Sequence, residues 1–129
     1  MNIAGPISAL IASNSTANGL LGGRVYANVL LQEGALPGAA ISITDDTPNN
    51  TKTGPSDLDR ILVQIDIYGN TYIEAAQTSD AVRAAIDYQV DNANNIAGIF
   101  FLRTRDIYSD RPLKHRRLSE YSVMLTRSV

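Results

Sequence analysis

The chain has 129 residues, of which 44% are hydrophobic, 19% charged and 6% aromatic, and its net charge is −2. This length and balance predict one globular domain over residues 1–129 and exclude a wholly disordered chain, collagen and a coiled coil. Cysteine is absent, which excludes disulfides, thiolate metal sites and thiol catalysis.

The N-terminal segment predicts a short helix over residues 6–17. Pro6 suits a first helical turn, and Ile7, Leu10 and Ile11 recur at helical spacing. The first basic residue is Arg24, so we expect no signal peptide, and no apolar run approaches the ~20 residues that span a bilayer. We therefore expect synthesis in the cytoplasm of the producing cell, with later assembly into a particle.

The next segments predict turns and strands. Asn18 and the glycine-rich residues 19–23 indicate a helix stop and a turn, after which residues 24–26 start a short strand or run extended. Residues 39–44 alternate apolar and polar side chains, which predicts a strand. Residues 45–57 contain no large apolar side chain and predict a polar loop or arm.

The remainder predicts three strands and a long helix. Residues 58–68, 96–107 and 115–126 have strand periodicity, and residues 71–91 predict a helix. That helix carries a narrow stripe of small and apolar side chains, namely Ala75, Ser79, Val82, Ile86 and Val90. This order predicts an α+β fold: a mainly antiparallel sheet packed by one long helix and a short N-terminal helix.

Groups able to catalyse a reaction are scarce. The single histidine, His115, lies among cations, and no serine lies in a Gly-x-Ser-x-Gly motif. The glycines at 19–23 form no phosphate-binding fingerprint. The carboxylate pairs, such as Asp57 with Asp59, are too isolated to indicate a metal site. We predict no enzyme, no cofactor and no metal.

Charge is divided unevenly along the chain. Residues 1–100 carry a net charge of −6, whereas residues 101–129 carry +4. The basic cluster allows three interpretations: phosphate contacts with a nucleic acid, a solvated turn, or a contact with an acidic subunit or partner. Its members are Arg103, Arg105, Arg111, Lys114, His115, Arg116 and Arg117.

The order of these segments resembles the tail-completion, or tail-terminator, proteins of long-tailed bacteriophages. The resemblance runs from about Ile7 to Met124. It is carried by Leu-Leu-Gly-Gly-Arg-Val-Tyr at 20–26, Leu-Pro at 36–37, the strand at 61–68, the helix stretch at 75–86 and Lys-His-Arg at 114–116 before the last strand. It implies an α+β sandwich without a cofactor.

The resemblance also implies a function in the virion. Such proteins form a ring, usually of six copies, on the head-proximal end of the tail tube. The ring stops tube polymerisation and docks to the head connector, and DNA passes through it without being read for sequence. Under this interpretation the basic cluster, together with Asp45, Asp46 and Lys52, contacts neighbouring subunits or the tail tube protein.

Three other functions remain open at this point. The chain could be another neck, head-completion or tube-like virion protein of similar size. It could be a small nucleic-acid-binding module that uses the basic cluster. An enzyme is the least favoured class, because cysteine is absent, histidine is single and nucleotide-binding loops are missing.

Overall fold

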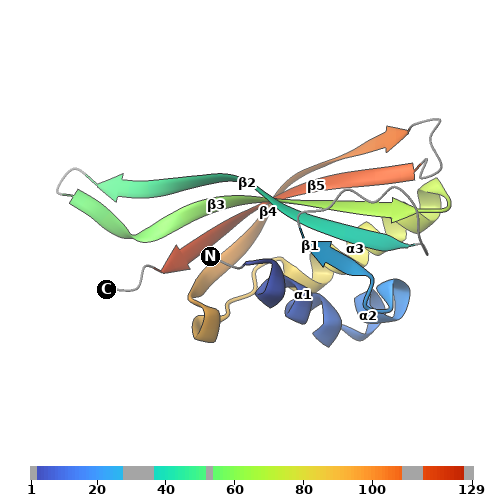
Figure 1. Cartoon of the computed structure of the whole chain (residues 1–129), viewed down its shortest axis with the longest axis horizontal. Coiled ribbons are helices and arrows are strands. Elements are labelled where there is room, and N and C mark those ends of the chain that lie inside the picture. The colour runs from blue at the N-terminus through green and yellow to red at the C-terminus, as the bar shows by residue number, and fades with distance from the viewer. Residues whose placement is uncertain (1–2, 28–36, 52–53, 109–114, 127–129) are drawn as a thin grey trace.

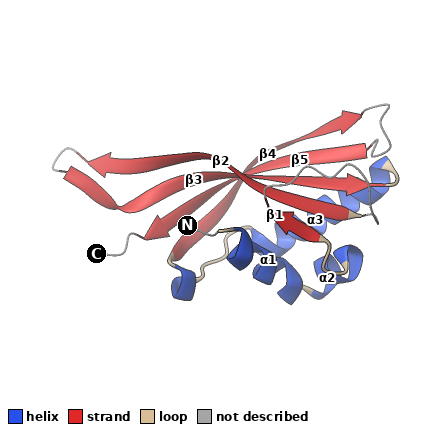
Figure 2. Ribbon diagram, in the orientation of Figure 1, coloured by secondary structure: helices blue, strands red, loops and turns tan. Residues whose placement is uncertain are grey.

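A computed structural model describes residues 3–27, 37–51, 54–108 and 115–126, with the backbone alone described at 45–51 and 54–58. Its centre is a five-stranded sheet of order β1-β2-β3-β5-β4 (Figure 2). The strands are β1 (Val25–Ala27), β2 (Gly38–Thr51), β3 (Gly54–Gly69), β4 (Ile96–Tyr108) and β5 (His115–Thr126). Only the β1–β2 pair is parallel among these ladders. The predicted α+β fold with a mainly antiparallel sheet is confirmed.

Three helices lie together on one face of this sheet (Figure 1): α1 (Ala4–Ser13), α2 (Ser15–Leu21) and α3 (Tyr72–Ile86). The single predicted N-terminal helix is therefore wrong. The backbone of Asn14 is extended and ends α1, while its side chain accepts the Ala17 N–H at 3.0 Å and caps α2. The predicted stop at Asn18 is also wrong, because the left-handed residue that ends α2 is Gly22, with φ 56°.

The hydrophobic core lies between these helices and the sheet. Alternate residues of β3 from Ile61 to Ile67 face it, as the strand periodicity predicts. The β5 residues on the same face pack beside them, and four of the five stripe residues predicted on α3 are buried. The largest fully buried side chains include Ile7, Ile11, Leu21, Ile41, Ile86, Ile99 and Tyr121.

Of the polar loop or arm predicted at 45–57, the loop is wrong, because β2 continues to Thr51 and β3 begins at Gly54. β2 and β3 pair from Gly38 opposite Tyr68 to Thr51 opposite Gly54, with register shifts near Asp45 and Asn50. Backbone groups satisfy one another along such a ladder without apolar side chains, so composition gives no signal. The resulting hairpin reaches away from the helices (Figure 1).

The long helix is shorter than predicted. α3 begins at a Thr71 cap, whose hydroxyl accepts the Glu74 N–H, and ends at Ile86 instead of 91. Beyond it Tyr88 takes a left-handed conformation, with φ 63°, and Val90 is exposed. A short 3₁₀ turn, η1 (Asn92–Asn94), then leads into β4. No helix in the described ranges combines the length and apolar character needed to cross a membrane.

Candidate subunit interface

The sheet face opposite the helices carries most of the predicted basic residues of β4 and β5. In the described part of the chain no helix lies on this face (Figure 1). The register places Arg103 beside Glu120 and Arg105 beside Leu118, and Arg116 lies two residues before Leu118 on β5. The face nevertheless buries polar groups, because long side chains cover one another across neighbouring strands.

Arg116 is committed to a buried carboxylate. Its Nε donates to Asp66 Oδ1 at 3.1 Å, and the Asp66 side chain is only 2% exposed. Gln64 donates to the same carboxylate at 3.1 Å, and the Arg116 guanidinium lies 5.8 Å from the Tyr68 ring centroid. These contacts join β3 to β5, so the charge of Arg116 is neutralised by the Asp66 carboxylate of its own subunit.

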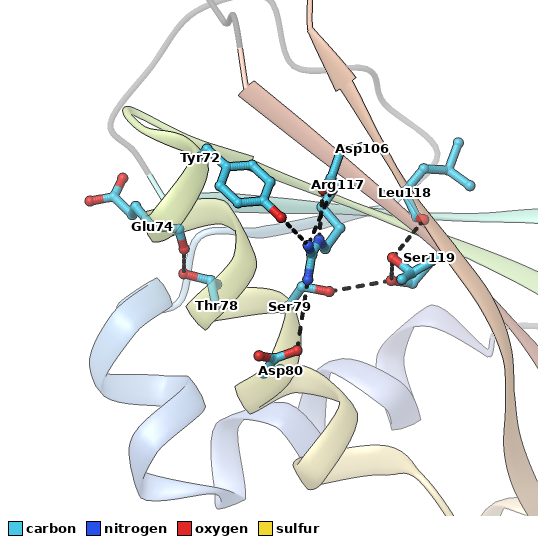
Figure 3. A network of polar contacts seen from close by, with 10 residues as sticks. Tyr72, Glu74, Thr78, Ser79, Asp80, Asp106, Arg117, Leu118 and Ser119 are labelled. Carbon is cyan, nitrogen blue, oxygen red and sulfur yellow. Dashed lines mark hydrogen bonds and ion pairs between the residues drawn. The ribbon is translucent and has the colours of Figure 1, made fainter.

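Arg117 points to the helix side and joins three elements (Figure 3). Its Nε donates to Asp106 at 2.7 Å, and its Nη2 donates to Asp106 at 3.2 Å and to the Tyr72 hydroxyl at 3.2 Å. Asp80 lies 3.8 Å from its Nη1. The Arg117 hydrogen bond lowers the pKa of Asp106, and the same bond raises the pKa of Arg117. This network ties the charged half of β4 to α3.

Arg103 and Arg105 are the exposed basic residues of β4. Arg103 donates twice to Glu120 Oε2, at 2.9 and 3.1 Å, but its side chain is 75% exposed. Arg105 is exposed, and its guanidinium has no hydrogen bond or ion pair with any residue that the structure describes. Both line a shallow hollow with Thr104, Leu118 and Glu120. The Arg105 guanidinium is therefore available to a partner.

The remaining predicted interface residues fall in different places. His115 begins β5, and its ring meets Tyr108 edge-on at 5.4 Å. Asp45 and Asp46 lie on β2, where only the backbone is described, opposite Leu62 and Ile61 of β3. Outside the described residues lie Lys52, Arg111 and Lys114.

The two halves of β4 differ along their outer edge. In the first half, the Tyr88 N–H donates to the Ile99 carbonyl at 2.7 Å, and Asp87 accepts the Phe101 N–H at 3.0 Å. From 102 to 108, no described residue outside the β4–β5 ladder bonds to this edge. Strand-edge groups are a ready template for pairing with another chain.

Sequence reasoning missed an exposed apolar group beside this edge. Tyr88, Val90, Phe100 and Leu102 are all exposed, and Tyr88 meets Phe100 edge-on with ring centroids 5.9 Å apart. The signal was available in Phe100-Phe101-Leu102, since three consecutive bulky residues cannot all face one side of a strand. This group widens the candidate interface along β4.

Metal-binding groups and buried polar groups without a partner are scarce among the described residues. No group of three or more His, Cys, Asp or Glu there could hold a metal ion. The buried Tyr121 hydroxyl has no partner there, and burial raises its pKa. Tyr121 belongs to the hydrophobic core.

Comparisons with known proteins agree with a virion protein. The sequence profile of the family described as "Tail completion protein gp17" matches residues 6–126. One solved chain, from a structure titled "Virion of native gene transfer agent (GTA) particle", is similar with a TM-score of 0.67 and 17% identity. The match covers 98% of this chain and 100% of that chain. No curated protein matches the sequence.

Proposed function

Because the chain belongs to the tail completion protein gp17 family of phage tail structural proteins, we propose that it caps the tail tube. In this proposal several copies, six in the usual case, form a ring on the head-proximal end of the tube. The ring stops tube polymerisation and offers the surface that docks to the head connector. Its role is structural, and no cofactor takes part.

The family match over residues 6–126 carries this proposal. It includes every helix and strand of the structure except the first two residues of α1. The likeness to a chain of a gene transfer agent particle supports the same fold. A fold alone assigns no function, so the specific capping role rests on the family.

The distribution of charge and free backbone supports a ring. A ring of identical copies needs two different surfaces that complement each other, head to tail. β4 offers the free charge of Arg105 and the exposed Arg103 at one sheet edge, and Asp45 and Asp46 lie on β2 toward the other edge. We assign Lys52, Arg111, Lys114 and His115 to contacts with neighbours, the tail tube protein or the connector.

The arginine pairings argue against a dedicated nucleic-acid site. Arg103, Arg116 and Arg117 each have a carboxylate partner within their own subunit. Protein cations bind nucleic acid by neutralising phosphates and so releasing the counterions that surround the nucleic acid. Cations that are already paired with a carboxylate contribute less to this binding. We therefore propose that DNA passes through the ring without sequence-specific binding.

Deleting the gene from the parent phage or prophage tests the proposal. Negative-stain microscopy should reveal filled heads beside unattached, overlong tails, and a plasmid copy should restore joined particles of normal tail length. Normal virions after deletion would contradict the proposal. Particles without any tube would contradict it too, and would indicate a tube subunit.

A further inference from the structure

The sheet has two long stretches of free edge, at opposite ends of the strands. On β4 the free stretch runs from 102 to 108. On β2, β1 pairs only with Ala39 to Ile41, so the outer edge from 42 to 51 has no partner among the described residues. Proteins usually shorten, charge or cover such edges, because bare edges pair with other chains.

We infer that the free edge of β4 pairs with the free edge of β2 in the next copy, which closes the ring as one continuous sheet. This inference rests on the proposed ring. The occupant of each edge is thus a second copy of this chain, and each copy uses its two edges for two different neighbours.

Strand direction agrees with this pairing. From β2 to β3, β3 to β5 and β5 to β4 each step is antiparallel, so β4 runs opposite to β2. Rotation about the ring axis does not change whether a strand runs up or down that axis, so equivalent strands of all copies point the same way along it. β4 therefore meets the neighbour's β2 as an antiparallel partner, which is the commoner and slightly more stable kind of ladder.

The stagger of the free edges also agrees. Closing a sheet tilts its strands by about 35–45°, and four strand spacings of about 4.8 Å separate β2 of one copy from β2 of the next. The register therefore advances by roughly four to six residues per copy. Arg105 is level with Leu118, Asp66 and Ala40 in its own sheet. In the neighbouring copy the register is shifted about four to six residues from Ala40 along β2. This shift places Arg105 opposite residues 44–46 of the neighbour, beyond the part of β2 that β1 covers.

Charge is complementary at this register. The β2 segment that comes opposite Arg105 contains Asp45 and Asp46 in succession. The Arg105 guanidinium has no hydrogen-bond or ion-pair partner among the described residues of its own subunit. Electrostatic complementarity at an edge favours one partner and one register over others.

A disulfide between copies tests the register directly, because the natural chain has no cysteine. The variant Asp45→Cys with Arg105→Cys is built into the phage, and purified particles are oxidised and run on a non-reducing gel. Within one chain the two sites are separated by three strand spacings across the sheet, roughly 14 Å, and are also staggered along the strands, so they are too far apart for a disulfide. We expect most of the protein in covalent multiples of 13.9 kDa.

Two control variants fix the interpretation. Asn50→Cys with Arg105→Cys moves the β2 site about four to six residues out of register, so we expect at least a tenfold lower yield of multimers. Arg105→Cys alone should remain monomeric on the gel. A monomeric 45/105 variant in assembled particles, or equal linkage of the 50/105 variant, would overturn the edge pairing.

A proline at Thr104 provides a second, independent variant. Phe101 donates its N–H away from β5 to Asp87, and by the register Thr104 is outward-facing as well. Thr104→Pro removes one outward donor and the hydroxyl, whereas Thr104→Val removes only the hydroxyl. We expect Thr104→Pro, but not Thr104→Val, to lose incorporation into particles at least tenfold; equal incorporation would overturn the edge pairing.

Tail length on the same particles separates this inference from the proposed function. Normal tails without cross-links would overturn the edge pairing and leave the capping role in place. Cross-linked multimers on particles with overlong tails would keep the edge pairing and overturn the capping role.

Discussion

The two halves of β4 belong to one strand but differ in their surroundings. The first half, from Ile96 to Phe101, puts Ile96 and Ile99 into the core, and residues 87–91 cover its outer edge. The second half, from 102 to 108, is charged and exposed, and its edge is bare within the described residues. Both halves pair with β5 in one ladder that contains two register shifts.

This difference separates folding from assembly along a single strand. Burial of apolar area stabilises the first half within one copy. The second half gains less from its own subunit, because its ion-pairing residues Arg103 and Asp106 are 75% and 44% exposed, and pairs of this kind contribute about 0–1 kcal/mol each. An exposed strand of this kind is best explained by a neighbour that completes it.

The largest expected effect comes from the core of the first half. Ile99→Ala should lower the free energy of unfolding by about 2–5 kcal/mol, because it leaves a cavity where a fully buried side chain packs. Denaturant unfolding measures this change. Arg105→Ala in the second half is the matched control and should change stability by less than about 0.5 kcal/mol. Similar losses at both sites would contradict the division.

The next effect distinguishes an arginine that is paired within its own subunit from Arg105, whose side chain is unpaired among the described residues. Arg116→Ala leaves the buried Asp66 carboxylate without its cation. We expect a loss of about 2–3 kcal/mol, less than for a fully buried pair because Arg116 is partly exposed. Adding Asp66→Asn to Arg116→Ala should recover much of the loss in the same unfolding assay. No recovery would mean that the pair does not account for the effect.

A charge exchange across the proposed contact has a smaller effect, on assembly alone. Arg105→Asp and Asp45→Arg should each weaken incorporation into particles by roughly two- to fivefold, as expected for an exposed ion pair. The double exchange should restore incorporation, and high salt should reduce all differences. Quantitative gels of purified particles measure this, and additive losses in the double variant would contradict the contact.

The smallest effect concerns the Asp106–Arg117 pair. The pKa of Asp106 is lowered in the folded chain, so its contribution to stability is present above the ordinary value of 3.8 and is lost as pH falls through the folded pKa. Asp106→Asn should cost a few tenths of a kcal/mol near neutral pH, because the pair is partly exposed. The difference from the natural chain should vanish at the lowest pH, as denaturant unfolding can measure. A constant difference would contradict this.

Periodicity predicted the core and the class of fold, because it records which side of a strand is buried. The alternation from Ile61 to Ile67 placed one face of β3 in the core, and the limits of β5 at 115 and 126 agree with the structure. Two features escaped this reasoning for a physical reason. The hairpin through Asp45 is held by backbone pairing, and the turn at Asn14 depends on one side-chain cap.

The candidate interface was less predictable than the fold. Sequence composition revealed the basic cluster, but ion pairs depend on strand register, which composition does not contain. Arg103 and Glu120 are far apart in the chain and meet only because β4 and β5 pair. The sequence therefore could not distinguish Arg105, which has a free charge, from its paired neighbours.

Cryo-electron microscopy of the head-proximal end of the tail tests the central claim most directly. The account predicts a closed ring of this chain between tube and connector, with residues 102–108 of each β4 beside the neighbour's β2 near Asp45. A ring whose β4 edge faces solvent, or this chain in another part of the particle, would contradict it.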